Sequence, residues 1–470
     1  MRFIRLAALA LVVTLAVGGI SSAAVDDAMR PHHFKKRGEH WNPSAKPGKP
    51  GRGTPSSRDS VNIKVLGHHD PGGPSGDVFL HKGFAYMGSW GFFSEDGAFC
   101  RALGVRAYDL SDPKNPDLVS TFADGASDAR LAKSWTEKVQ VRKVRSRWFK
   151  GDLAVVSFQD CAPGGFTGIG LYDVSDPSDP ELLSLREDGI FGVHELWLEA
   201  RGRKAYVYEA ANFHEVAAFE AGEDPDEVNP EFRIIDVSDP RNPVQVGDWS
   251  AWRDMGVTPL DGIGTFPVNF VHSVYVDSKV AYVSYWDFGT VMLDVRDPSS
   301  PEFLGRTEFG EGDEGNAHSA WTNWQGDILV QTDEDFDPTP NPDVETGWGY
   351  GHIYDISDKS NPVELATLKL PSTHQFPPPG PGDFTIHDPK IKNKTLYTSW
   401  YTEGVVIWDI ADPSNPKKIG QFIPPEKAED PLGVFYPGEE FVEIWGVYLG
   451  PGYVVASDMN TGLWVFRVRR

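Results

Sequence analysis

A short phrase of turn-forming residues recurs six times along this chain of 470 residues. Each copy follows a run of aliphatic residues and reads Asp-x-Ser-Asp-Pro-x-x-Pro or a close variant. The leading aspartates, about sixty residues apart, are Asp109, Asp173, Asp236, Asp294, Asp355 and Asp409. A repeat of that period predicts an array of identical supersecondary units. It constrains the architecture strongly and the activity very little.

Each repeat is predicted to contain four β-strands. In the copy that begins at Val271, we expect strands at 272–276, 280–285, 290–295 and 302–307, where β-branched and aromatic residues are frequent. The repeated phrase then connects the third strand to the fourth. Its Asp and Ser side chains can bond to turn amides and its prolines restrict φ, so turn chemistry accounts for the phrase. We therefore interpret these aspartates as structural and not catalytic.

Four-stranded units that repeat radially are typical of a β-propeller. Segment 443–470 supplies three strands of a further unit and then ends, whereas residues 60–67 form a solitary strand before the first repeat. If this solitary strand completes the last blade, the ring closes and two exposed edges disappear. We therefore predict an all-β fold, a seven-bladed β-propeller of four-stranded antiparallel blades, closed by an N-terminal strand that pairs with the C-terminal blade.

The first 59 residues differ from the rest of the chain. Residues 1–24 combine two arginines, an apolar stretch and a Ser-Ala-Ala ending, which predicts a secretory signal peptide. Residues 25–59 are basic and rich in Pro and Gly, so we expect a flexible arm, followed by the propeller over 60–470. The expected location is extracellular or at the cell surface. No second apolar run has the length of a membrane helix, so an integral membrane protein is not expected.

Charge and cysteine content narrow the range of partners further. The chain has 68 acidic and 44 basic residues, and a negative field of that size repels nucleic acid, so no nucleic-acid partner is expected. Cys100 and Cys161 are its two cysteines, and they lie in corresponding loops of neighbouring repeats. In an oxidising compartment an even number of cysteines favours a disulfide, so we expect these two to be bonded.

The repeated phrase, together with the Ala-Tyr-Val-Ser-Tyr-Trp-Asp-Phe-Gly segment from Ala281, resembles the LVIVD-repeat proteins of bacteria and archaea. The resemblance extends over about 60–470 and implies a secreted or surface β-propeller. It implies no activity and no catalytic residues. The copies depart from the pattern in minor ways: Lys359 replaces the first proline of its copy, and Arg296 and Ala411 replace the serine of theirs.

Function is therefore sought in what differs between blades. The turns that carry the phrase are nearly uniform and form one face. Long insertions fall on the opposite face, between the second and third strands of a blade or between consecutive blades. They are 210–230, 253–267, 333–350, 371–383 and 424–440. Because loops on a rigid scaffold commonly carry recognition, we expect this top face to bind an extracellular protein, peptide or glycan.

Four histidines share one register at the start of the first strand of consecutive blades. They are His194, His272, His318 and His387. First strands are innermost, so these imidazoles are expected to converge at the top mouth of the channel, with Glu137 at the same register in the second blade. Imidazole is a favoured ligand of iron, copper, nickel and zinc, and Glu137 could be a further ligand or orient a ring. The alternative is that duplication copied a residue which only stiffens each blade.

A second set of polar residues is expected where the second strands end. It consists of Trp90, Gln159, Glu209, Asp287, Asp333, Glu403 and Asp458. These side chains could add carboxylates around the mouth, although capping of the loops is the favoured interpretation. The acidic run with Asp333, Glu334, Asp335, Asp337 and Asp343 could hold calcium. Its spacing matches no calcium loop, so calcium is the less favoured ion.

Two hypotheses about function remain open from the sequence. The first is a binding or scaffold propeller that acts through its top-face loops. The second is a metal-dependent enzyme, an oxidoreductase or a hydrolase, with a four-histidine site at the mouth of the channel. The chain has no phosphate-binding glycine loop and no Gly-x-Ser-x-Gly motif that would indicate other chemistry.

Overall fold

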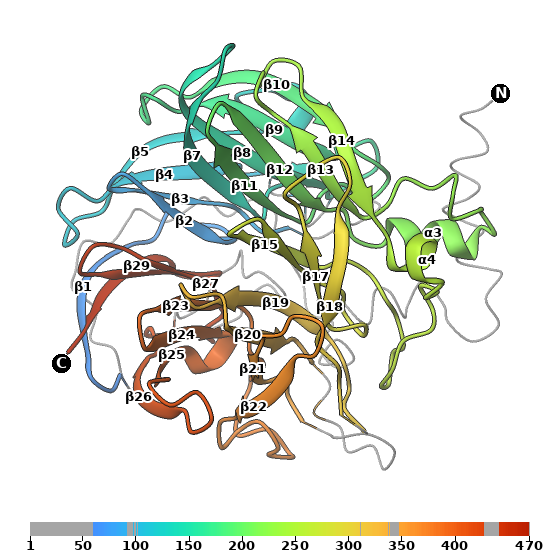
Figure 1. The fold of residues 1–470 in the computed structure, drawn as a ribbon. Coiled ribbons are helices and arrows are strands. Elements are labelled where there is room, and N and C mark those ends of the chain that lie inside the picture. The colour runs from blue at the N-terminus through green and yellow to red at the C-terminus, as the bar shows by residue number, and fades with distance from the viewer. Residues whose placement is uncertain are drawn as a thin grey trace.

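The computed structural model describes residues 60–91, 97, 100, 102–310, 312–336, 338, 347–426 and 441–469. In this part of the chain, seven antiparallel sheets are arranged around a central axis (Figure 1). The predicted all-β, seven-bladed propeller is therefore confirmed. The predictions for 1–24 and 25–59, for Asp337 and Asp343, and for most of 424–440 lie outside the described residues.

The strands of the first four blades follow one another along the chain from the inner to the outer edge of each sheet. Blade 1 contains β2 (Val78–His81), β3 (Phe84–Met87), β4 (Val105–Asp109) and β5 (Asp117–Phe122). Blade 2 contains β6 (Ser134–Trp135), β7 (Val139–Arg145), β8 (Lys150–Asp160), β9 (Gly168–Asp173) and β10 (Glu181–Glu187). Blade 3 contains β11 (Glu195–Arg201), β12 (Lys204–Ala210), β13 (Phe232–Asp236) and β14 (Val244–Trp249). Blade 4 contains β15 (Ser273–Asp277), β16 (Val280–Ser284), β17 (Thr290–Asp294) and β18 (Glu302–Arg306). The strands of blade 4 agree with the sequence prediction to within one residue at each end.

The last three blades complete the circle. Blade 5 contains β19 (Ala317–Thr322), β20 (Ile328–Asp333), β21 (Gly351–Asp355) and β22 (Val363–Leu368). Blade 6 contains β23 (Pro389–Lys392), β24 (Thr395–Trp400), β25 (Gly404–Asp409) and β26 (Lys417–Phe422). Blade 7 contains β27 (Ile444–Leu449), β28 (Val454–Asp458), β29 (Gly462–Val468) and β1 (Ile63–His69). Helices α3 (His214–Glu220) and α4 (Ala251–Met255) lie side by side outside the ring, where the Phe219 and Trp252 rings are 5.4 Å apart (Figure 1). Short 3-10 turns occur at Ala129–Leu131 and Tyr401–Glu403.

The N-terminal strand closes the ring as predicted. Strand β1 pairs antiparallel with β29, from Ile63 opposite Val468 to His69 opposite Leu463. Ile63 also packs into the same apolar cluster as Val405 and Ile407 of blade 6. This strand forms backbone hydrogen bonds with the open edge of blade 7 and buries apolar surface against blade 6. The pairing therefore removes the exposed edges that an open ring would have.

The repeated phrase has the turn chemistry expected of it. In each copy the leading aspartate accepts a hydrogen bond from the backbone N–H two residues later, as from Ser111 to Asp109 at 2.7 Å and from Ser357 to Asp355 at 2.8 Å. The phrase also joins neighbouring blades, which turn chemistry does not predict. The hydroxyls of Ser120 and Ser184 donate at 2.6 Å to the carbonyls of Pro177 and Pro240, which lie in the phrase of the following blade.

Glycines take the place of these serines in other blades because the approach is closer there. A Cβ at Gly247 would lie 2.0 Å from the carbonyl oxygen of Pro298, and one at Gly305 would lie 1.9 Å from that of Lys359. Such distances allow no side chain without movement of the backbone. The phrase therefore acts as a docking surface between blades as well as a turn.

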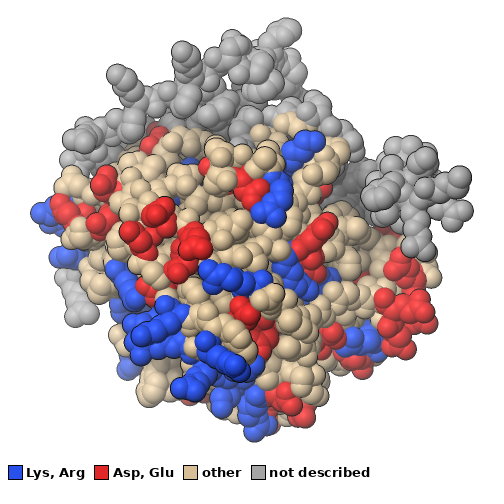
Figure 2. Space-filling model, turned by 90° about the horizontal axis from the view of Figure 1, so that it is seen from above, with Lys and Arg blue, Asp and Glu red and all other residues tan. Residues whose placement is uncertain are grey.

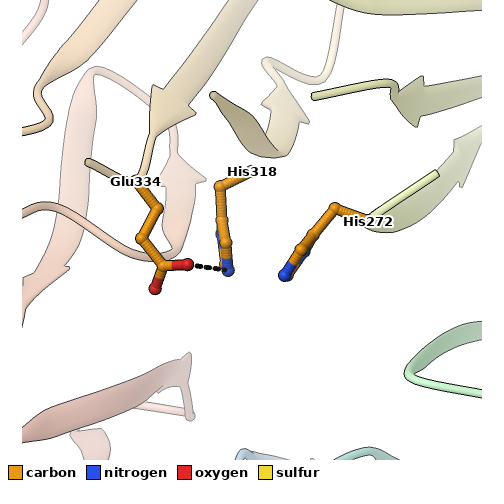
Figure 3. A group of neighbouring side chains, drawn as sticks. All are labelled: His272, His318 and Glu334. Carbon is orange, nitrogen blue, oxygen red and sulfur yellow. Dashed lines mark ion pairs between the residues drawn. The ribbon is translucent and has the colours of Figure 1, made fainter. Parts of the chain in front are cut away.

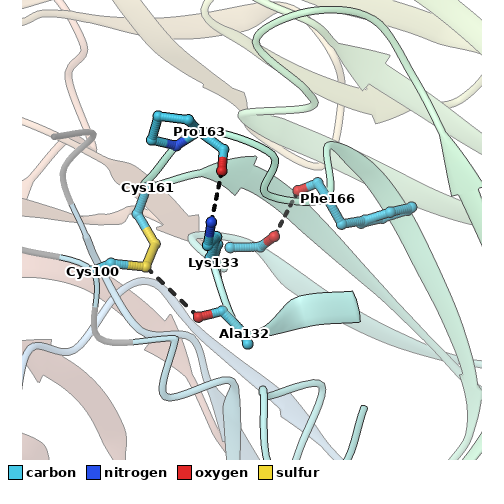
Figure 4. The surroundings of a disulfide bond; sticks show 7 residues. Cys100, Ala132, Lys133, Cys161, Pro163 and Phe166 are labelled. Carbon is cyan, nitrogen blue, oxygen red and sulfur yellow. Dashed lines mark hydrogen bonds between the residues drawn. A yellow bond between two sulfur atoms is a disulfide. The ribbon is translucent and has the colours of Figure 1, made fainter. Parts of the chain in front are cut away.

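The disulfide between Cys100 and Cys161 is present and joins the loops of blades 1 and 2 (Figure 4). Beside it, Lys133 Nζ donates to the carbonyl of Pro163 at 2.9 Å. Within the described residues, no helix is long and apolar enough to cross a membrane. Acidic and basic side chains are mixed over the side of the molecule shown in Figure 2, so the acidic excess of the chain is not gathered there in a single patch.

Candidate functional site

Seven innermost strands contact one another in a ring around the axis, and the histidine register lies at their upper ends. In blade 5 the pairing of β19 with β20 shifts between Ala317 and Ser319, so that His318 is the extra residue of a β-bulge. Trp445 is the extra residue at the same position of blade 7. A bulge redirects a side chain out of the regular alternation. This local irregularity explains how these two side chains can turn toward the axis.

The four histidines come together in one chain of rings. The Nε2 atoms of His194 and His272 are 3.1 Å apart. The ring centroids of His272 and His318 are 4.0 Å apart, and those of His318 and His387 are 4.2 Å apart. Trp445 continues the chain at 4.2 Å from His387. The predicted convergence of the four imidazoles is therefore observed.

The depth of the cluster differs from the prediction of a site at the mouth. The four histidines are 0–4 % exposed, so they lie beneath the surface. Aromatic side chains account for this burial, since Trp286 packs 5.3 Å from His272 and Tyr401 packs 5.5 Å from His387. The rings of Trp90 and Trp135 also pack near His194, with centroids 6.2 and 6.1 Å from that of the imidazole. Sequence register could place the histidines around the axis but could not show what covers them.

The axis below the cluster is filled. Three residues further along the inner strands, Trp197, Tyr275 and Trp321 pack against one another with centroids 4.2–5.7 Å apart. On the opposite side of the axis, the rings of Phe79 and Tyr448 are 4.7 Å apart. These aromatic residues separate the histidine cluster from the lower face of the propeller.

Hydrogen bonds set the tautomer of two of the histidines. Nδ1 of His194 lies 2.6 Å from Gln159 Oε1 and 2.8 Å from Glu137 Oε2, both of which are acceptors. Nδ1 of His318 lies 3.0 Å from the carbonyl oxygen of His387. In both residues Nδ1 must therefore carry the proton, which leaves a lone pair on Nε2. In His194 that lone pair accepts the hydrogen bond from Nε2 of His272. Glu137 lies behind His194, on the side away from His272, where a residue that orients the ring would be.

A carboxylate that the sequence did not place in this site completes the cluster. Glu334 Oε2 lies 3.7 Å from His318 Nε2, and Glu334 Oε1 accepts a hydrogen bond from the hydroxyl of Tyr401. One ligand atom from each of His272, His318 and Glu334 lies within 4.8 Å of the other two. Figure 3 shows the two imidazoles side by side, with the carboxylate against the tip of His318.

Glu334 was noted in the sequence only as part of an acidic loop. Its position becomes recognisable once the second strands are aligned on a recurrent hydroxyl residue. Two positions after that hydroxyl residue stand Gln159, Trp286, Glu334 and Tyr401, and each of them contacts a histidine of the cluster. The hydroxyl residues are Ser157, Ser284, Thr332 and Ser399.

The other carboxylates predicted near the mouth cap loops or form ion pairs, and all of them except the half-buried Glu403 are buried. Asp287 accepts the backbone N–H groups of Val268 and Asn316, and Asp458 accepts that of Glu443. Asp333 pairs with His352, whose Nε2 lies 2.9 Å away. Glu209 lies 3.5 Å from an Arg186 nitrogen, and Glu403 accepts from Ser372. Of this predicted set, Gln159 and Trp90 contact the histidine cluster.

The residues that follow the histidine register form a layer of buried charges. Lys138 Nζ lies 2.8 Å from Asp77 Oδ2 and 2.9 Å from Glu195 Oε1. Lys390 pairs with Asp388 in the same layer. These ion pairs place two ammonium groups and three carboxylates directly beneath the imidazoles.

Burial controls the protonation state of the cluster. It lowers the pKa of His194 to about 3, with the Lys138 charge as a further cause, and it lowers the pKa of His272, His318 and His387 well below the ordinary value. The same burial raises the pKa of Glu334 to about 8. All four imidazoles are therefore neutral at pH 7, which is the form that binds a metal ion.

Comparison with known proteins supports the repeat assignment. Residues 228–250, 271–308 and 346–369 match the family described as LVIVD repeat. No curated protein matches the chain. A crystal structure of the computationally designed Ika8 protein is similar over 86 % of this chain and 99 % of that chain, with 10 % sequence identity and a TM-score of 0.48.

Proposed function

The chain is a β-propeller built from LVIVD repeats, and we propose that it holds a transition-metal ion on its axis and functions as a metal-dependent protein. The proposed ligands are His194, His272, His318 and Glu334. Glu137 and Gln159 orient His194 from behind. The chemistry is that of an oxidoreductase or a hydrolase, since both classes use a metal ion with an incomplete protein shell.

The observation that carries the proposal is the set of bare ring nitrogens in a buried place. Among the described residues, Nδ1 of His272, Nε2 of His318 and both nitrogens of His387 have no hydrogen-bond partner. Buried polar atoms without a partner are rare in native proteins and call for a water molecule or an ion. A metal ion bound to Nε2 of His318 would satisfy one of these nitrogens directly, beside the carboxylate of Glu334.

The spacing of the nitrogens fits a shared ion. Two nitrogens that each bind one ion at about 2.1 Å lie roughly 3.0–3.4 Å apart at right-angled or tetrahedral geometry. The His194 and His272 Nε2 atoms are 3.1 Å apart. His272 also belongs to the group with His318 and Glu334, in which one ligand atom of each residue lies within 4.8 Å of the other two.

Charge around the axis favours a cation. Among the described residues on this part of the axis, Asp77, Glu137, Glu195, Glu334 and Asp388 are buried acids. Lys138 and Lys390 are the two buried ammonium groups beside them. A surplus of buried carboxylates must be neutralised by protons or by a bound cation. Metal binding would therefore replace the proton on Glu334.

The ligand types favour iron, copper, nickel or zinc over calcium. Imidazole suits the first four ions, whereas calcium requires six to eight oxygen ligands. Both cysteines of the chain are in the disulfide, so thiolate ligation does not enter. The disulfide is also consistent with an oxidising compartment, and we propose that the protein works outside the cell.

Metal analysis of the purified chain tests the proposal. After loading with each of the four ions and removal of loosely bound metal, the wild-type protein is expected to retain about one ion per chain, and His272→Ala is expected to retain none. His81→Ala is the matched control, since His81 lies on an inner strand but pairs with Asp152 far from the cluster. Retention of less than a tenth of an ion by the wild type, or full retention by folded His272→Ala, would refute the metal centre.

A second candidate function has a separate observation behind it. Connections between blades on the top face expose the large apolar side chains of Ile190, Met255, Ile263 and Phe376. Exposed apolar groups on loops are common in surfaces that bind an extracellular protein, peptide or glycan. Peptide and glycan arrays probed with the wild type and with Ile263→Ser/Phe376→Ser test this function. Equal signals from both proteins would exclude these loops as the binding surface.

A further inference from the structure

We infer that His387 is not a metal ligand but forms the wall of a ligand-binding position next to the ion, and that this position takes a small uncharged oxygen ligand of the dioxygen or hydrogen peroxide class. His387 would hydrogen-bond to that ligand. The inference rests on the proposed metal centre and specifies what that centre binds.

The position of His387 separates it from the proposed ligand shell. Its ligand atoms are not part of the group in which His272, His318 and Glu334 lie within 4.8 Å of one another. Its backbone carbonyl is held by Nδ1 of His318 at 3.0 Å and by the hydroxyl of Ser319 at 2.9 Å. The residue is thus anchored by its main chain, while neither ring nitrogen has a hydrogen-bond partner in the described part of the structure.

The walls around His387 offer ring faces and few polar groups. Trp445 and Tyr401 pack against the imidazole with centroids 4.2 and 5.5 Å away. The polar atom of each is already used, since Trp445 Nε1 donates to Glu137 at 3.1 Å and the Tyr401 hydroxyl donates to Glu334. A ligand at this position would therefore meet apolar surface and one imidazole edge.

Size and charge restrict the ligand class. His387 is 1 % exposed, and the aromatic residues beneath the cluster fill the axis, so only a small molecule can be accommodated. The surplus of carboxylates that favours a cation at the centre disfavours an additional anion. An uncharged diatomic or peroxide ligand satisfies both conditions, and it can accept a hydrogen bond from an imidazole N–H.

The coordination set leaves room for such a ligand. Two histidines and one carboxylate are the protein ligands of many non-haem iron sites, where open positions bind exogenous molecules. His272, His318 and Glu334 have this composition, and His194 adds one nitrogen from the side opposite to His387 in the chain of rings. On the side facing His387, both nitrogens of a buried imidazole have no hydrogen-bond partner among the described residues.

Nitric oxide binding to the ferrous-loaded protein tests the inference without oxygen. The wild type is expected to take up one iron per chain and to bind nitric oxide, measured by electron paramagnetic resonance, at least about tenfold more tightly than azide. His387→Phe is expected to keep its iron and to lose about tenfold in affinity for nitric oxide, since one hydrogen bond in a buried site is lost. His387→Gln, which keeps a donor, is expected to stay within about threefold of the wild type.

Each other outcome has a definite meaning. Loss of iron in folded His387→Phe would make His387 a ligand and overturn the inference, and so would unchanged nitric oxide affinity in that variant. Azide binding as tight as nitric oxide binding would overturn the uncharged class. Absence of iron and of the other three metals from the wild type would instead refute the metal centre itself. His81→Phe is the control and is expected to match the wild type in both measurements.

Discussion

Removal of the Lys138 charge is the perturbation that most directly tests how the inner layer is stabilised. Lys138 Nζ bridges Asp77 and Glu195 at 2.8 and 2.9 Å, and its side chain is 10 % exposed. Burial opposes the ammonium charge, but the two carboxylates outweigh it and raise the pKa of Lys138 well above the ordinary value. In Lys138→Met the apolar stem is kept and only the charge is lost, so packing changes little.

The expected cost follows from what remains behind. Two buried carboxyl groups lose their counter-charge, and breaking a buried pair in this way typically costs about 3–5 kcal/mol. Replacing all three charges, as in Asp77→Asn/Lys138→Met/Glu195→Gln, leaves no unpaired charge. The triple variant is therefore expected within about 2 kcal/mol of the wild type or above it.

Urea unfolding followed by tryptophan fluorescence measures the effect, with midpoint and slope fitted separately. Lys82→Met is the matched control, since Lys82 pairs with Asp152 at 2.6 Å but its side chain is 51 % exposed. An exposed pair contributes about 0–1 kcal/mol, so this control should lose no more than that. A loss below about 1 kcal/mol in Lys138→Met, or a triple variant as unstable as the single one, would refute the reasoning.

Three further predictions concern blade docking, pH and the disulfide. Gly305→Ala is expected to lower the free energy of unfolding by about 1–3 kcal/mol, because its Cβ would meet a carbonyl oxygen of the next blade. Gly380→Ala is the control and should change the free energy little, since no atom lies within 4 Å of the added Cβ. Equal effects of the two variants in urea unfolding would contradict this. Burial opposes the charge of His352, but Asp333 and its other carboxylate partner raise its pKa from 6.5 to about 10, so its stabilising contribution should be complete below pH 6.5 and disappear as the pH rises through 10. Thermal unfolding from pH 6 to 10 checks this, and His352→Gln with an unchanged pH profile would disprove it. The disulfide joins residues that are 61 positions apart, so its removal in Cys100→Ser/Cys161→Ser gives the unfolded chain more conformational freedom. The free energy of unfolding is expected to fall by about 2–4 kcal/mol, and an unchanged melting temperature would count against this.

The fold could be predicted almost completely because its determinants are local. The period of the aspartates, the turn chemistry and the alternation of apolar residues each act over a few residues, and their agreement from blade to blade leaves one architecture. The closing strand could be found for the same reason: segment 443–470 lacks a fourth strand and residues 60–67 lack a partner. What the phrase does between blades was missed because the contact of Ser120 with Pro177 depends on how one sheet packs on the next.

The site was predicted only in part, and the division has a physical basis. The four histidines share one register, and residues at the same register of a repeat protein occupy equivalent positions in successive blades. Their convergence near the axis could therefore be predicted from the sequence alone. Glu334 shares a register with Gln159, Trp286 and Tyr401 just after the second strands, but the residue type changes from blade to blade, so the repeat pattern did not mark it as a ligand.

Four further properties of the site depend on distances between blades that no local pattern encodes. These are the bare nitrogens, the carboxylate beside His318, the aromatic cover and the ion-paired layer around Lys138. The order of residues along the chain sufficed to specify a ring of seven blades with imidazoles near its axis, since strand period and turn geometry are properties of short segments. Packing of the blades around the axis was needed to bury those imidazoles, keep them neutral and bring Glu334 against them, because burial and charge are set by every blade at once.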